Sequence, residues 1–183
     1  MASYETVLEY WFEEVGPSRW YAHDADLDAD MRKRFEGDVL AARRGELDAW
    51  ILHPREALAL MILLDQMPRN IWRGEAGSFS SDAHAVAMAK KALNLGHDEK
   101  VEEIARQFFY LPLMHSESQM DQDRCVRLIL SNMPDSGAEN LKHAVAHRDV
   151  IRKFGRFPFR NEALGRDCTP DEKAWLAEGG YRT

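Results

Sequence analysis

The sequence has little of what cross-links or interrupts a chain: two cysteines, 11 glycines and seven prolines in 183 residues. Cys125 and Cys168 lack the paired spacing of a zinc site or a disulfide framework, so we expect both to be unbridged. That points to a reducing compartment, and we expect a cytoplasmic protein. With so little glycine and proline, no segment has the composition of a linker or a low-complexity region.

Long apolar runs are also missing. The longest run, residues 57–64, suits a buried helix and is far shorter than the roughly 18 residues of a membrane span. The start of the chain has neither a basic segment nor a small-residue cleavage site, which predicts that there is no signal peptide. We therefore expect no membrane partner.

Positive charge is scarce and unevenly placed. The formal net charge of −7 argues against the broad positive field that non-specific binding to nucleic acid requires, so we expect no nucleic-acid partner. Between Arg148 and Arg166, however, five arginines and one lysine stand against two acids. Arginine forks bind carboxylates and phosphates with two parallel hydrogen bonds. An arginine-rich segment in an acidic chain favours a specific anion site over a general polyanion surface.

What the sequence does contain is helical periodicity. Apolar residues recur every four positions at Leu27, Met31, Phe35 and Val39, and no segment alternates as a strand would. Caps and breakers predict helices that start at Ser3, at Asp24 or Asp26, at Pro54 (ending at Pro68), at Ser80 or Ser81 (ending at Gly96), at Asp98 (ending at Pro112), after Pro112 (reaching Leu130), at Gly137 (ending at Gly155) and at Thr169. We expect an all-α chain folded as one domain over residues 1–183, with antiparallel helix pairs stacked on each other.

Three segments, residues 64–74, 108–117 and 154–166, hold more polar and aromatic groups than packing requires. Their motifs are Asp65–Asn70, Leu111–Pro112 with His115–Glu117, and Phe154–Pro158. In this order and spacing the chain resembles an uncharacterised bacterial protein family, over nearly its whole length. The resemblance implies an all-helical, tetratricopeptide-like fold and no particular activity. The family usually has histidine where this chain has Phe159, so any role of that histidine is in doubt here.

The candidate ligand-binding residues lie in these segments: Asp65, Arg69, Asn70, Arg73, His115, Glu117, Arg156, Arg160, Asn161 and Arg166. Pro-Arg-Asn at 68–70 is echoed by Pro158 and Arg160-Asn161, so we expect the two loops to meet beside His115–Glu117. The pocket would take an anionic small molecule or a peptide carboxylate. The leading hypothesis is a binding module that needs no cofactor; the sequence leaves its oligomeric state open.

Two alternatives remain open at this point. His115, with Glu117 to orient it, has the chemistry of a general base in a hydrolase or transferase acting on an anionic substrate. Alternatively, the motifs are purely structural, with arginines at helix ends paired to Asp65, Glu117 and Glu162. His143 and His147, four residues apart on one helix face, form a weak candidate metal pair, since no glutamate follows His143 as the zinc-protease pattern requires. The favoured alternative is a partly buried His147 bonded to a neighbouring loop.

Overall fold

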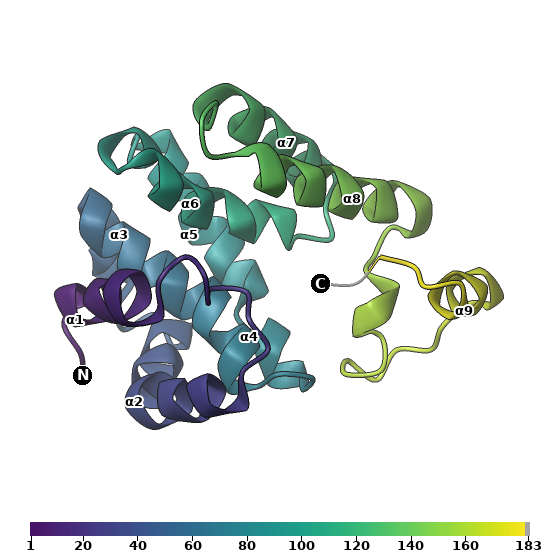
Figure 1. The fold of residues 1–183 in the computed structure, drawn as a ribbon, viewed down its shortest axis with the longest axis horizontal. Helices are drawn as coiled ribbons and strands as arrows, with labels where there is room; N and C mark the ends of the chain where they lie inside the picture. The colour runs from purple at the N-terminus through teal and green to yellow at the C-terminus, as the bar shows by residue number, and fades with distance from the viewer. Residues whose placement is uncertain (182–183) are drawn as a thin grey trace. The chain divides into compact units, whose positions relative to one another are not determined.

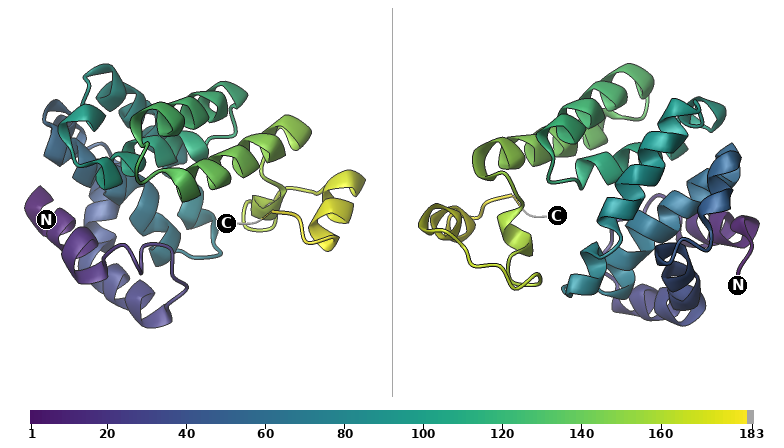
Figure 2. Two further views of the ribbon diagram at one scale, coloured as in Figure 1. Left: turned by 45° about the horizontal axis from the view of Figure 1, so that its top comes forward. Right: turned by 180° about the vertical axis from the view of Figure 1, so that it is seen from behind.

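The computed structural model describes residues 1–181, and these residues form helices and no strand, which confirms the predicted all-α class (Figures 1 and 2). The chain divides into two compact units, Met1–Pro112 and the part from Leu113 onward. That the chain is a single domain with tetratricopeptide-like stacking stays a prediction. Within the described part of the chain, every helix is too short or too polar to cross a membrane.

The first unit contains α1 (Tyr4–Glu9), α2 (Ala25–Arg43), α3 (Pro54–Met61), α4 (Met67–Ile71), α5 (Asp82–Asn94) and most of α6 (Glu103–Met114). Two π-helical turns extend these helices: η1 (Tyr10–Val15) continues α1, and η3 (Ile62–Gln66) joins α3 to α4. Short 3-10 turns complete the connections: η2 (Asp48–Leu52), η4 (Ala76–Phe79) and η5 (Asp98–Lys100).

The core of the first unit forms where α1 and α2 pack against α3, η3 and α4. The predicted stripe on α2, from Leu27 to Val39, is buried at each of its four positions. The segment from α3 into η3 is buried throughout residues 57–66, as a helix that is apolar on nearly all sides must be. Trp20 packs beside Trp11 and donates its indole N–H to the Trp11 carbonyl at 2.8 Å. The polar N–H of this buried ring is therefore hydrogen-bonded.

The second unit contains α7 (Gln119–Asn132), α8 (Ala138–Phe154), the 3-10 turn η6 (Pro158–Arg160) and α9 (Pro170–Ala177). Helices α7 and α8 lie side by side (Figure 1). Gly155, with φ of 69°, ends α8 in the left-handed conformation that glycine favours. The chain then turns back to bury Phe157 against Val150 and Ile151. The predicted capping box at the start of α9 is confirmed, with Thr169 and Glu172 each accepting from the other's backbone N–H.

Several predicted helix ends are wrong. Pro68 lies in the first turn of α4, where its missing N–H costs nothing, so it does not end the helical segment. Pro112 lies inside α6, which continues to Met114. Asp98 accepts a hydrogen bond from the Tyr110 hydroxyl at 2.7 Å and sits in η5, whereas α6 starts only at Glu103.

The cysteines do not form a disulfide among the described residues. Cys125 is buried in α7, and Cys168 is half-buried just before α9. The amide of Asn161 donates to Cys168 Sγ at 3.2 Å, so this thiol takes part in the local hydrogen bonding.

Candidate functional site

In the first unit, Arg69 of α4 lies between two carboxylates. Its Nη2 donates to Asp65 Oδ1 at 3.0 Å and to Asp82 Oδ1 at 2.9 Å. Burial opposes the charge of Arg69, but attraction to Asp82 and Asp65 outweighs that cost and raises the pKa of the guanidinium. Arg69 thus ties η3, α4 and α5 together through acids of the protein itself.

The end of α4 is held to α2 through a single acid. Asp28 accepts from Asn70 Nδ2 at 2.8 Å, and from Arg73 Nε at 2.7 Å and Nη2 at 2.9 Å. Such paired bonds from Arg73 fix a loop in orientation as well as in position. Asp28 was not among the predicted site residues, because in the sequence it reads only as a first-turn acid of its helix.

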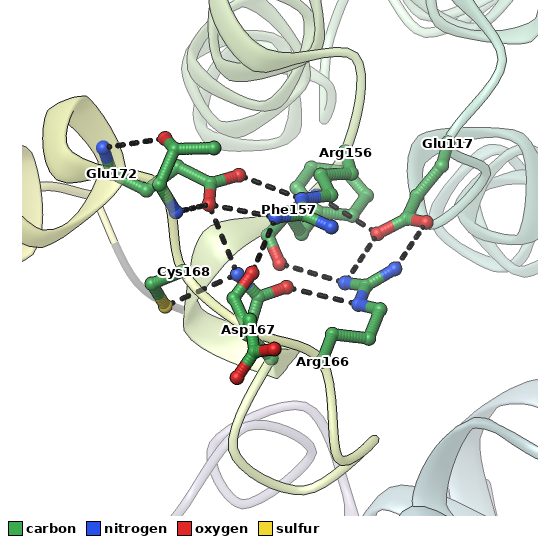
Figure 3. Close-up of polar contacts among 9 residues, drawn as sticks. Glu117, Arg156, Phe157, Arg166, Asp167, Cys168 and Glu172 are labelled. Atoms are coloured by element: carbon green, nitrogen blue, oxygen red, sulfur yellow. Dashed lines mark hydrogen bonds and ion pairs between the residues drawn. The ribbon is translucent and has the colours of Figure 1, made fainter.

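In the second unit, Glu117 receives a fork from Arg166 (Figure 3). The two N–O distances are 2.8 and 3.0 Å, and the Phe157 N–H donates to the same carboxylate at 2.8 Å. Arg166 also donates to the Asn161 side chain at 2.9 Å and to the Phe157 carbonyl at 3.1 Å. Burial raises the pKa of Glu117, but the bonds from Arg166 and Phe157 together bring it below the usual value. The 154–166 loop is thereby fixed onto the chain just before α7.

A second fork joins Arg156 to Glu172 of α9, at 2.7 and 2.8 Å (Figure 3). Glu172 is 2% exposed and also accepts from Thr169 N at 2.8 Å and Asn161 Nδ2 at 3.3 Å. The Arg156 bond leads the effects that lower the pKa of Glu172 to about 2, against the opposing effect of burial. Arg156 and Asn161 are therefore parts of the connection between α8 and α9.

A hollow of about 700 Å³ adjoins this second fork. Its charged lining consists of Asp171, Glu172 and Glu178 against Lys153 and Arg156. Because acids outnumber bases there, the hollow does not have the positive field that an anionic ligand requires.

A different arrangement surrounds His147 of α8, which is 1% exposed. Its Nδ1 lies 2.8 Å from the His143 carbonyl and must donate to it, so Nε2 carries a lone pair. That Nε2 is buried and has no hydrogen-bond partner among residues 1–181. The imidazole ring of His147 has the rings of His115, Phe157 and Tyr181 as neighbours, at centroid-to-centroid distances of 6.0, 5.4 and 5.1 Å.

Arg160 is the most buried arginine of the 154–166 loop, at 4% exposure. Its guanidinium lies 4.4 Å from the centroid of Phe157 and 5.7 Å from that of Phe159. Burial first, then the charges of His115 and Arg160, lower the pKa of His147 to about 3, although its bond to the His143 carbonyl acts in the opposite direction. His147 is thus a neutral acceptor at physiological pH, next to a fixed positive charge.

His143 and His147, the weak candidate metal pair, each direct Nδ1 to a different partner within the protein. His143 directs Nδ1 to the Tyr181 hydroxyl at 2.6 Å, while His147 directs Nδ1 to the backbone of His143. Over the described residues, no group of three or more histidine, cysteine, aspartate or glutamate side chains has a geometry that would hold a metal ion.

The predicted site residues fall into two groups. Asp65, Arg69, Asn70 and Arg73 belong to the first unit; His115, Glu117, Arg156, Arg160, Asn161 and Arg166 belong to the second. That the two groups share one pocket stays a prediction. Asp82 and Glu172 were not among the predicted site residues, although the capping box already marked Glu172 in the sequence. Asp65 and Glu117 hold arginines as the structural alternative expects, whereas Glu162 is exposed.

The depressed pKa of His147 predicts an acid-sensitive stability. In the unfolded chain His147 binds a proton below about pH 6.5, the usual histidine pKa. In the folded chain it stays neutral down to about pH 3, so lowering the pH between these values favours unfolding. We expect unfolding free energy to fall by up to about 1.4 kcal/mol per pH unit between pH 6.5 and 5, before most carboxylates titrate. Urea unfolding across this range should show the slope in the wild type and in His23→Gln, an exposed control, but not in His147→Leu. Equal slopes in all three proteins would contradict the assignment.

Comparison with known proteins agrees with the fold and adds no activity. The sequence profile of a family described as "Bacterial protein of unknown function (DUF924)" matches residues 7–180. The chain is also similar to the solved structure of a protein of unknown function, ATU0120, from Agrobacterium tumefaciens. The two share 42% sequence identity, the match covers 96% of this chain and 97% of that one, and the TM-score is 0.89. No curated protein matches the chain.

Proposed function

Because this chain belongs to the DUF924 family of bacterial proteins of unknown function, we propose a function from its own geometry: the second unit binds a small anionic ligand beside His147 and Arg160. The ligand carries a carboxylate or phosphate group, and we place the protein in the cytoplasm. The proposal treats the chain as a binding module.

The observation that carries this proposal is the buried Nε2 of His147, to which no residue in the described part of the chain donates a hydrogen bond. A buried polar atom normally has a partner in the protein, in water or in a ligand. Since Nε2 is an acceptor, its partner must donate a hydrogen bond, as a hydroxyl or a protonated phosphate does. The nearby charge of Arg160 favours an anion, so a ligand with both features matches the cluster. His115 is half-buried, so it is the part of the cluster that solvent reaches.

The contacts of the other predicted residues support a structural role for them. Asp65, Arg69, Asn70 and Arg73 bond within the first unit, and Glu117 with Arg166 fixes a loop of the second. Their part in binding is therefore indirect: they hold the loops in place. The proposed ligand site therefore centres on His147, with the ring of His115 and the charge of Arg160 beside it.

Catalysis with His115 as general base finds less support than binding. Its neighbour Ser116, the nearest hydroxyl in the sequence, donates to Asp121 at 2.9 Å and accepts from Ser118 N at 3.2 Å. Ser116 is thus engaged in the turn that precedes α7. Glu117, the expected partner of His115, is held by Arg166.

Calorimetric titration with inorganic phosphate and with citrate tests the proposal. We expect the wild type to bind at least one of them, and His147→Phe and Arg160→Gln each to weaken binding by about tenfold or more, equivalent to about 1.4 kcal/mol. Arg152→Gln is the matched control, because that exposed arginine of α8 pairs with Asp123 and lies outside the cluster. Thermal unfolding of each variant shows whether it is folded. No binding by folded wild type, or equal binding by all variants, would end the proposal.

A further inference from the structure

A groove of about 560 Å³ lies in the first unit, lined by residues of α1, η1, the start of α3 and the start of α6. Leu8, Phe12 and Ile104 contribute to its apolar lining. Ile104 is 41% exposed although it is a large apolar residue, and Phe12 is only half-buried. An apolar channel of this kind is suited to receive the side chains of another molecule.

The border of the groove is strongly acidic. Glu5, Glu9 and Glu13 follow one another at steps of four along α1 and η1, and Glu102 stands across from them before α6. All four side chains belong to exposed residues. Like charges at this spacing repel each other along a helix. The row therefore costs the isolated unit some stability, a cost that a positively charged partner would remove.

Arg55 and Lys100 are the two cations in the lining, against the four glutamates. Two positive charges cannot neutralise the four glutamates of the border, and the chain as a whole has a net charge of −7. The groove therefore combines an apolar floor with a net negative rim, which is complementary to a segment that is apolar on one face and basic on the other.

We propose that this groove is a docking site for a basic amphipathic segment of a partner protein. The apolar face of the segment lies against Leu8, Phe12 and Ile104, and its lysines or arginines meet the row of glutamates. The site is independent of the anion site of the second unit, since it has the opposite charge preference and none of the same residues.

The test uses a fluorescent synthetic peptide in which leucine and lysine alternate with helical periodicity, and a second peptide with glutamate in place of lysine. Fluorescence anisotropy with the full chain is expected to show binding of the lysine peptide and not of the glutamate peptide. Binding should weaken as salt is raised, because exposed charges are screened. The double variant E9K/E13K should lose about tenfold or more in affinity.

The control variant E139K/E162K changes the net charge of the protein by the same amount, at exposed positions of the second unit. It should bind as the wild type does. Ile104→Asn tests the apolar floor separately and should also weaken binding, with circular dichroism to confirm folding. Equal loss in both double variants would show non-specific attraction and overturn the proposal, as would equal binding of the two peptides. Sedimentation that detects self-association abolished by E9K/E13K would instead assign the groove to a second copy of the chain.

Discussion

Asp65→Ala is expected to lower the free energy of unfolding by about 3–5 kcal/mol, because it leaves part of a buried ion-pair network without its negative charge. The carboxylate side chain is fully buried and accepts from Arg69 and from the side-chain amide of Gln66. Asp82 would still neutralise Arg69, so we expect the lower half of this range if Asp82 shifts toward the vacated position.

Denaturant unfolding followed by tryptophan fluorescence measures this effect in the first unit. The matched control is Asp149→Ala, since Asp149 is 59% exposed and surface ion pairs contribute about 1 kcal/mol at most. Asp65→Asn keeps the shape of the side chain and removes only its charge. Its loss of unfolding free energy should lie between the losses of Asp149→Ala and Asp65→Ala. A loss below about 1 kcal/mol for Asp65→Ala would show that the network is not needed for stability.

Phe157→Ala should have an effect of similar size on the second unit, about 3–5 kcal/mol, because the ring is fully buried and the unit is small. The ring packs with Val150 and Ile151, faces His147, and lies under the guanidinium of Arg160. Its backbone N–H and carbonyl bond to Glu117 and Arg166, so loosening the ring also loosens that fork.

Hydrogen exchange read by mass spectrometry distinguishes a local effect from a global one. We expect Phe157→Ala to increase exchange in α8 and the 154–166 loop first, since local opening precedes global unfolding where contacts are few. Phe157→Leu, which keeps most of the apolar volume, should cost only about 1–1.5 kcal/mol. Unchanged exchange in this loop would mean that Phe157 does not hold it.

The helices that the sequence predicted correctly have local causes. The stripe from Leu27 to Val39 fixes which face of α2 is buried, and Thr169 with Glu172 fixes the start of α9. Both patterns lie within one helix, where spacing alone determines which side chains meet.

The wrong helix ends have causes outside the local pattern. The π turn ends at Gln66 and leads directly into α4, whose first turn contains Pro68. Asp98 accepts from the distant Tyr110 and lies in η5, before α6 begins. Proline is compatible with a first helical turn, so whether it stops or starts a helix depends on the segment before it.

The candidate site could be predicted only in part. The sequence indicates that a buried arginine pairs with an acidic residue, but it does not indicate which one. The pairings of Arg73 with Asp28 and of Arg166 with Glu117 join residues far apart in the chain. His147 was singled out only for its spacing to His143. The surroundings of its Nε2, which has no partner among the described residues, come from three separate segments, and no local pattern encodes them.

The π turn between α3 and α4 determines where the length of this chain can vary. A π turn holds one residue more than the regular helix would need. Deleting a single residue from Ile62–Gln66 would restore regular winding and leave the helix that follows close to its present orientation, whereas deleting one from the regularly wound α3 would turn everything that follows by about 100°. Arg69 would then face away from Asp82, and Asn70 away from Asp28, although no contact residue had been changed. Descendants of this gene should therefore tolerate the loss of one residue within the π turn but not within α3.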